Sequence, residues 1–245
     1  MVTAGVLIIG NEILSGRTQD ANLQYIAKHL VARGITVAES QVVPDIEDVL
    51  VQRINYLRKN YDYVLTTGGI GPTHDDITAH CVAKAFGVSL VIDEAIAERI
   101  RGRPAPEEVM QNRLLMARVP KGASLIENST GGPQGFQIEN VYVMAGIPFV
   151  LQSMLPNIEF KGGDVVRSKS IKVYLGESNI AAELAQIQEQ HVTLDIGSYP
   201  FTGESRYGTV LVIRGTDPSE IDSAASKIKS MVVAQGETPE EIDST

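Results

Sequence analysis

Apolar segments of strand length alternate with helix-like patterns over the first 90 residues. The predicted strands are residues 2–9, 35–43 and 61–67. In the segment after each strand, apolar residues recur at intervals of three or four, as along one face of a helix; they are Leu23, Ile26, Leu30 and Val31, then Val49, Leu50, Ile54 and Leu57, then Ile77, Cys81, Val82 and Ala85. Three successive strand-then-helix units predict a three-layer α/β fold, with a mostly parallel sheet and helices on both faces.

The first domain extends to about residue 160. Helices are predicted at residues 93–101, where Asp93 can cap the first turn, and at residues 107–119. Residues 136–144 are typical of a paired strand or a hairpin, and residues 148–158 are typical of a closing helix. We therefore assign residues 1–160 to one domain.

A change of composition indicates a second domain. Residues 161–164 carry charge and two glycines, which suits a linker. The elements predicted after this linker are a strand at 171–175, a helix at 180–188, strands at 192–196 and 210–214, and a helix at 218–233. This β-α-β-β-α order predicts a small α+β domain over residues 165–236, with its helices on one face of the sheet. Residues 237–245 form an acidic tail that we expect to be disordered.

Charge and cysteine content narrow the classes of partner. The 245 residues carry a formal net charge of −9, so we expect no general electrostatic attraction to nucleic acid or to an anionic membrane. Cys81, the only cysteine, excludes an intrachain disulfide, and its apolar helical context favours a buried side chain over a reactive thiol. No apolar segment reaches the roughly 20 residues of a membrane span. We expect a cytoplasmic protein that holds an anionic, phosphate-bearing small molecule through a few local groups.

The loop after the third predicted strand is the strongest candidate for that local site. In an open parallel sheet, ligands bind beyond the carboxyl ends of the strands. Gly68, Gly69 and Gly71 allow the backbone to approach phosphate oxygens closely, and a helix begins directly afterwards. Hydroxyl groups that could add hydrogen-bond donors belong to Thr67, Thr73 and Thr78. A tight turn with a Thr or Asp cap is the alternative interpretation.

Carboxylates follow two neighbouring strands at the same predicted edge of the sheet. Asp45 follows the second strand, and Asp75 and Asp76 follow the third. We predict that Asp45 and Asp76 are catalytic and that all three hold a divalent cation such as Mg²⁺, Mn²⁺ or Co²⁺, since these ions bind carboxylate oxygens and phosphates. Helix capping is the alternative for Asp75. Asn11 and Glu12, after the first strand, either contact the ligand or close a turn.

These motifs resemble the MoaB/Mog family of molybdopterin-binding-like proteins. The matching segments are Gly10-Asn11-Glu12-Ile13-Leu14, Val43-Pro44-Asp45 and Gly68-Gly69-Ile70-Gly71-Pro72-Thr73-His74-Asp75-Asp76-Ile77-Thr78. More specifically, the chain resembles the CinA-like (competence/damage-inducible) proteins and the amino-terminal module of eukaryotic FAD synthases, over residues 3–235. One departure is that Ala145 and Val150 replace the proline and the glutamate of the CinA-like pattern Pro-Gly-Val-Pro-x-Glu.

The resemblance implies a homo-oligomer, either a dimer or a trimer, and a pocket for a pterin or a dinucleotide. It also implies that Asp45 and Asp76 are functional acids and that a nucleotide pyrophosphate, such as FAD or ADP-ribose, is hydrolysed with a divalent metal. The alternatives are a non-catalytic pterin- or nucleotide-binding module and adenylyl transfer to molybdopterin in molybdenum cofactor synthesis. The chain ends before any nicotinamide-nucleotide deamidase or FAD-synthesising domain, so neither of those activities is expected of it.

Overall fold

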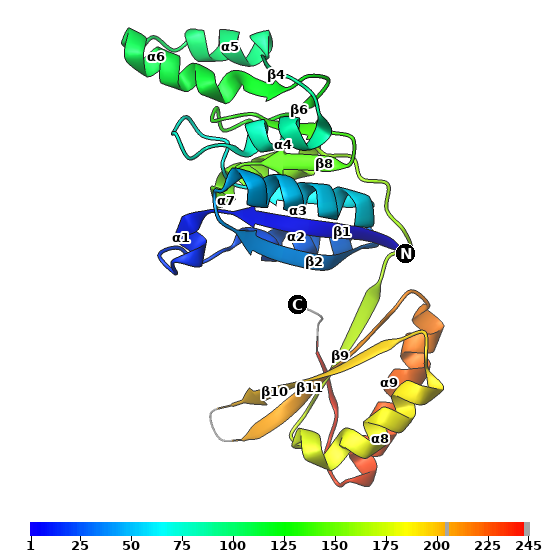
Figure 1. Cartoon of the computed structure of the whole chain (residues 1–245). Coiled ribbons are helices and arrows are strands. Elements are labelled where there is room, and N and C mark those ends of the chain that lie inside the picture. Colours follow the sequence, from blue (N-terminus) through cyan, green and yellow to red (C-terminus); the bar gives the residue numbers. More distant parts are fainter. Residues whose placement is uncertain (204–205, 243–245) are drawn as a thin grey trace. The chain divides into compact units, whose positions relative to one another are not determined.

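The computed structural model describes residues 1–203 and 206–242. The chain folds into two compact units, Met1–Gly163 and a second unit that begins at Asp164 (Figure 1). None of the helices in the described part of the chain combines the length and the apolar composition that a bilayer crossing requires.

The first unit is built on a mostly parallel sheet, as predicted. Its strands lie in the order β2 (Ile35–Val43), β1 (Val2–Ile9), β3 (Tyr63–Thr67), β8 (Val141–Met144), β7 (Gly135–Ile138) and β6 (Ser124–Ile126). The first four are parallel. Strand β7 is antiparallel to both of its neighbours, so the edge strand β6 runs in the same direction as the first four. Of the two interpretations of residues 136–144, the hairpin is correct, because β7 and β8 pair directly.

Helices cover both faces of this sheet because β1 is apolar on both sides. Alternate residues of a strand point to opposite faces. Ala4, Val6 and Ile8 pack toward one cluster of buried residues, and Leu7 and Ile9 pack toward the other. The helices that complete the first cluster are α2 (Asn22–Val31) and α7 (Pro148–Met154), and those that complete the second are α3 (Glu47–Asn60) and α4 (Thr78–Phe86) (Figure 1).

A short helical and extended region follows α4. The elements are β4 (Leu90–Ile92), α5 (Glu94–Arg101), α6 (Glu107–Leu114), a 3-10 turn at Leu115–Ala117 and β5 (Arg118–Pro120), which pairs with β4. Asp93 caps α5 as predicted, because its carboxylate accepts a hydrogen bond from the Ile96 N–H at 3.1 Å. The predicted helix at residues 107–119 was too long: Pro120 disfavours the helical conformation at Val119, which pairs with Val91 instead.

The strand register places several loops at one edge of the sheet. Ile9 is level with Val43, Ile8 with Thr67, and Thr67 with Met144. The loops that leave the parallel strands therefore begin side by side. The short helix α1 (Asn11–Leu14) follows β1 at this edge, and a 3-10 turn at Leu155–Asn157 extends α7.

The second unit is an antiparallel sheet with helices on one face, in the predicted β-α-β-β-α order. The strands lie in the order β10 (Asp195–Thr202), β11 (Tyr207–Gly215), β9 (Arg167–Val173) and β12 (Glu240–Ile242), and the helices are α8 (Glu177–Gln190) and α9 (Pro218–Ala234). The core forms where Ile171 and Leu211 of the sheet pack against Ile180 and Ile228 of the two helices. Strand β10 begins and ends later than the predicted strand at residues 192–196.

The acidic tail is in part ordered, so the expectation of disorder was wrong for residues 240–242. Glu240–Ile242 forms β12 and pairs antiparallel with β9. Glu241 explains why an acidic segment can add to the sheet, because its carboxylate contacts Lys229 at 2.6 Å and Lys169 at 3.3 Å. The last three residues of the tail lie outside the described part of the chain.

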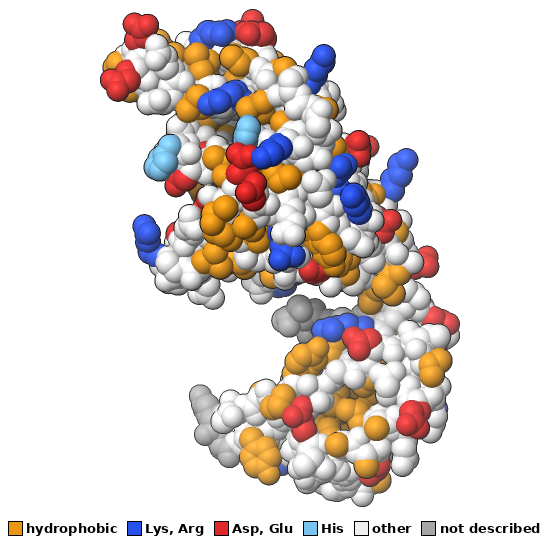
Figure 2. All heavy atoms as spheres, in the orientation of Figure 1, with side chains coloured by type: hydrophobic (Ala, Val, Ile, Leu, Met, Phe, Trp, Pro, Cys, Tyr) orange, Lys and Arg blue, Asp and Glu red, His pale blue; other side chains and the backbone are white. Residues whose placement is uncertain are grey.

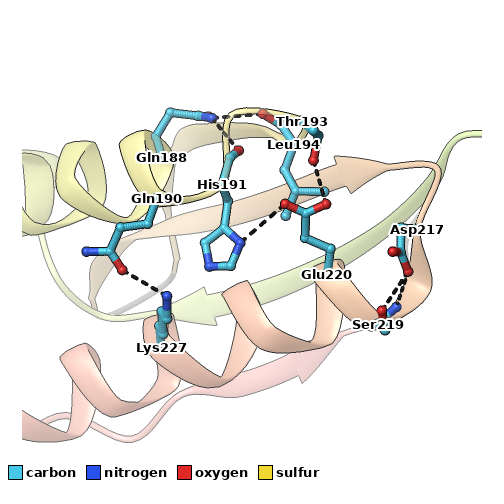
Figure 3. Close-up of polar contacts among 9 residues, drawn as sticks. All are labelled: Gln188, Gln190, His191, Thr193, Leu194, Asp217, Ser219, Glu220 and Lys227. Atoms are coloured by element: carbon cyan, nitrogen blue, oxygen red, sulfur yellow. Dashed lines mark hydrogen bonds and ion pairs between the residues drawn. The ribbon is translucent and has the colours of Figure 1, made fainter.

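A polar network holds the turn between α8 and β10 against α9 (Figure 3). The Gln188 side chain donates to the carbonyl oxygens of His191 and Leu194, at 3.2 and 2.8 Å. The Glu220 carboxylate of α9 lies 3.6 Å from Nδ1 of the buried His191 and accepts a hydrogen bond from the Thr193 hydroxyl. These contacts fix the chain reversal through side chains of two helices.

Candidate functional site

The glycine loop after β3 adopts a conformation that requires glycine at two positions. Gly68 and Gly69 have φ angles of 103° and 67°. A Cβ atom at Gly68 would lie 2.2 Å from the Ile9 carbonyl oxygen, and one at Gly69 would lie 2.2 Å from the Thr78 hydroxyl. The loop therefore passes so close to β1 and to the start of α4 that no side chain fits.

Thr78 supports this loop from inside the protein. Its side chain is fully buried, its hydroxyl donates to the Gly68 carbonyl at 3.0 Å, and its N–H donates to the Gly69 carbonyl at 3.1 Å. Thr67 is also buried, at 1 % exposure. Within the described residues no side chain caps the N-terminus of α4, so the backbone N–H groups that follow Thr78 in its first turn have no side-chain partner.

Thr73 organises the two aspartates that follow it. Its N–H donates to Asp76 Oδ2 at 2.8 Å, and its hydroxyl lies 2.5 Å from the same oxygen and 2.6 Å from Asp75 Oδ1. The hydrogen bond from Thr73 lowers the pKa of Asp75. Gly71 leaves room for this arrangement, since a Cβ atom there would lie 2.6 Å from Asp76 Oδ2. Both aspartates are thus held as part of the loop.

Asp45 connects the loops after β2 and β1. Its Oδ2 accepts a hydrogen bond from the Asn11 N–H, at the start of α1, at 3.1 Å. Partial burial raises the pKa of Asp45, and the negative charges of Glu12 and Asp75 raise it further against the opposing effect of the Asn11 hydrogen bond. The carboxylates of three different loops therefore repel one another, and among the described residues no Lys or Arg forms an ion pair with Asp45, Glu12 or Asp75.

The predicted metal ligands are brought to the same edge but do not form a closed cage. Over the described residues, no group of three or more His, Cys, Asp or Glu side chains could hold a metal ion by itself. Oxygen ligands are nonetheless the donors that Mg²⁺ and Mn²⁺ prefer, and Mg²⁺ is usually held by one or two carboxylates together with substrate phosphates. The Asp45 surroundings fit that mode of binding.

Two residues of the site were missed by the sequence analysis. Gly146 packs against the glycine loop after β3, since a Cβ atom there would lie 3.2 Å from the Gly68 Cα. Asn22 is buried, and its Nδ2 donates to the Gly146 carbonyl at 2.7 Å. Its Oδ1 has no hydrogen-bond partner among the described residues. The spacing Asp20-x-Asn22 was visible in the sequence, but the contact depends on the tertiary fold.

Comparison with known families matches both units. Residues 5–160 match the family described as "Probable molybdopterin binding domain", and residues 165–241 match the family described as "FAD synthase, middle domain". The first match covers more than half of the chain. The resemblance to the molybdopterin-binding-like proteins is therefore confirmed.

Individual proteins are also similar to this chain. A protein of Archaeoglobus fulgidus is 31% identical over 230 residues, which cover 93% of this chain and 96% of that protein. A CinA-like protein of Syntrophus aciditrophicus is 31% identical over 249 residues, but this chain spans only 58% of its length. The crystal structure of CinA from Thermoplasma acidophilum, whose function is given as unknown, matches with 32% identity and a TM-score of 0.57 over 63% of this chain and 94% of that chain. The chain therefore belongs to the molybdopterin-binding-domain family and, within it, to the CinA-like proteins.

Proposed function

We propose that this chain is a divalent-metal-dependent hydrolase of a nucleotide pyrophosphate of the FAD or ADP-ribose class. The observation that carries the proposal is the position of Asp45, a partly buried carboxylate of raised pKa beside Glu12 and Asp75, at the same sheet edge as the Gly68–Gly69 loop. Adjacent like charges without a basic partner are stabilised by a bound cation. A phosphate ligand beside them supplies the remaining oxygen ligands.

The protein's own groups have distinct tasks in this proposal. Backbone N–H groups of Gly69, Ile70 and Gly71, and those that follow Thr78 in the first turn of α4, bind phosphate oxygens. Asp45, whose Oδ2 accepts the Asn11 N–H at 3.1 Å, accepts the proton of the attacking water through its carboxylate. Asp76, held by Thr73 through Oδ2, and Asp75 would hold the cation. A bound Mg²⁺, Mn²⁺ or Co²⁺ supplies charge neutralisation on the phosphates. Water attacks one of the two phosphorus atoms of the pyrophosphate, and the bond from that phosphorus to the bridging oxygen breaks. AMP carries the oxygen from water if its own phosphorus is attacked, and it carries the former bridging oxygen if the other phosphorus is attacked.

The test is chromatographic detection of AMP from FAD, ADP-ribose and NADH, with and without each metal. Asp45→Asn is expected to reduce turnover by about 100-fold or more, since general bases contribute about 10²–10⁴. Asp62→Asn is the matched control, because Asp62 also accepts a backbone N–H, from Thr3 at 2.8 Å, but lies directly before the start of β3. Absence of AMP from all three substrates with every metal would contradict the proposal.

A non-catalytic pterin- or nucleotide-binding module is the second candidate. It is favoured by the lack of a self-sufficient metal-ligand group in the described chain and by the description of the matched family as molybdopterin-binding. It predicts nucleotide or pterin binding that is independent of metal, without product formation. Calorimetric titration in the presence of EDTA separates the two candidates.

A further inference from the structure

A cavity lies between the α5–α6 region and the loop at residues 127–134. Its volume is about 740 Å³, which lies in the range of small-molecule pockets. Its lining includes Arg99 of α5, Arg103 of the following turn, Arg113 of α6, and Gly131 and Gly132 of the loop. Among the described residues that line it, none is Asp or Glu. The cavity therefore has an uncompensated positive lining in a protein whose net charge is −9.

The three guanidinium groups keep most of their hydrogen-bond donors free. Arg103 donates from Nη1 to the Gly131 carbonyl at 2.7 Å, and Arg113 donates from Nη1 to the Arg103 carbonyl at 3.3 Å. In the described part of the chain, the Arg99 side chain makes no hydrogen bond or ion pair, whereas Arg101 on the same helix is paired with Glu94 at 3.0 Å. Each guanidinium has five N–H donors, so an anion in the cavity can receive several charge-assisted bonds.

This grouping differs from the general distribution of charge on the molecule. On the face drawn in Figure 2, Lys and Arg side chains are dispersed among Asp and Glu side chains rather than gathered in one stripe. Like charges that are brought together cost free energy unless a counter-ion neutralises them. Three arginines around a concave, acid-free surface thus favour an anionic small molecule over an extended polyanion.

The cavity lies at the same sheet edge as the glycine loop after β3. The antiparallel register sets Ile126, at the end of β6, level with Gly135, at the start of β7. Phe136 in turn is level with Val143, just before the end of β8. The loop at residues 127–134 therefore lies at the edge where the loops after β3 and β8 begin. It leaves the sheet at β6, three strand spacings or about 14 Å from β3, and returns at β7, two strand spacings or about 10 Å from β3.

We propose that this cavity binds a phosphate group of a nucleotide-sized molecule through Arg99, Arg103 and Arg113. The phosphate could come from the far part of the pyrophosphate substrate, which rests on the proposed function, or from a separate mononucleotide. Both sources share the same recognition, namely planar guanidinium donors around phosphate oxygens. Binding through the arginines does not require Asp45 or turnover.

Isothermal titration of the full-length protein with AMP and with inorganic pyrophosphate tests the assignment. Arg99→Gln and Arg113→Gln are each expected to weaken binding by about tenfold or more, because a charge-assisted hydrogen bond contributes about 1.5–3 kcal/mol. Arg101→Gln, an exposed arginine of the same helix outside the cavity lining, is expected to bind as the wild type does. Arg99 gives the cleanest result, since its side chain has no polar contact among the described residues to lose.

Two further arms separate this proposal from the proposed hydrolysis. Asp45→Asn is expected to retain binding of AMP that depends on Arg99, even where turnover is lost. If the pyrophosphate substrate displaces AMP, the cavity binds the far phosphate of the substrate. If AMP binds without being displaced, the cavity binds a separate nucleotide. The proposal is overturned if neither ligand binds at millimolar concentration, or if Arg99→Gln, Arg113→Gln and Arg101→Gln all bind with the wild-type affinity.

Discussion

Two glycines with nearly equal φ angles give a direct test of how the glycine loop after β3 is built. Gly69 and Gly87 have φ angles of 67° and 66°. A Cβ atom at Gly87, which ends α4, meets nothing within 4 Å, whereas one at Gly69 lies 2.2 Å from the Thr78 hydroxyl. Substitution by alanine therefore places a side chain at a positive φ at both positions but causes a steric clash at only one.

The structure sets the size of the difference. Left-handed backbone costs a residue with a Cβ atom about 1–2 kcal/mol, so Gly87→Ala is expected to lower the free energy of unfolding by that amount. At Gly69 the added methyl group must also displace the buried Thr78 side chain, at about 1–3 kcal/mol. The hydrogen bond from Thr78 to the Gly68 carbonyl is then lost, at about 0.5–1.5 kcal/mol. Gly69→Ala should therefore cost about 1.5–4.5 kcal/mol more than Gly87→Ala.

Urea unfolding followed by circular dichroism measures both losses. Adding Thr78→Ala to Gly69→Ala removes the clashing oxygen, so the double variant should lose less stability than the sum of the two single variants. Equal losses for Gly69→Ala and Gly87→Ala, or strict additivity with Thr78→Ala, would show that the loop does not pack as described.

Two other predictions rest on the raised pKa values of Asp45 and Cys81. Burial raises the folded-state pKa of Asp45, so its ionisation lowers the free energy of unfolding as the pH rises through that pKa. Asp45→Asn should therefore be more stable than the wild type at neutral pH, and this difference should shrink in acid. A difference in urea unfolding that does not change with pH would argue against this origin. Burial also raises the pKa of Cys81 to about 12, so a disulfide reagent such as DTNB should modify it at neutral pH only after unfolding, and rapid reaction of the native protein would contradict its placement.

The fold was largely predictable because its signals are local. The apolar run of β1 and the helical spacing of Ile26 and Leu30 are present in the sequence whatever the tertiary contacts. Where the prediction failed, the deciding contact was distant in sequence or involved proline. Strand β12 depends on the pairing of Glu241 with Lys169, 72 positions earlier (241 − 169), and α6 was extended too far because the effect of Pro120 was overlooked.

The candidate site was predictable in its loops but not in its contacts. Glycines and carboxylates after successive strands mark the sheet edge, which is why Gly68 and Asp45 could be chosen from sequence alone. The sequence does not show that Thr73 holds Asp76, or that Asn22 reaches Gly146. The arginine cavity was not predicted, because exposed arginines on short helices are typical of a solvated surface until the fold places them around one concavity.

We propose that the sheet edge that carries Asp45 hydrolyses a nucleotide pyrophosphate with a divalent metal. The most direct test of this proposal is AMP release from FAD and ADP-ribose by the wild type, Asp45→Asn and Asp62→Asn, each with Mn²⁺ or Co²⁺ and with EDTA. We predict metal-dependent AMP release that survives Asp62→Asn and is lost in Asp45→Asn. Equal release by all three proteins, or no release by the wild type with any metal, would contradict it.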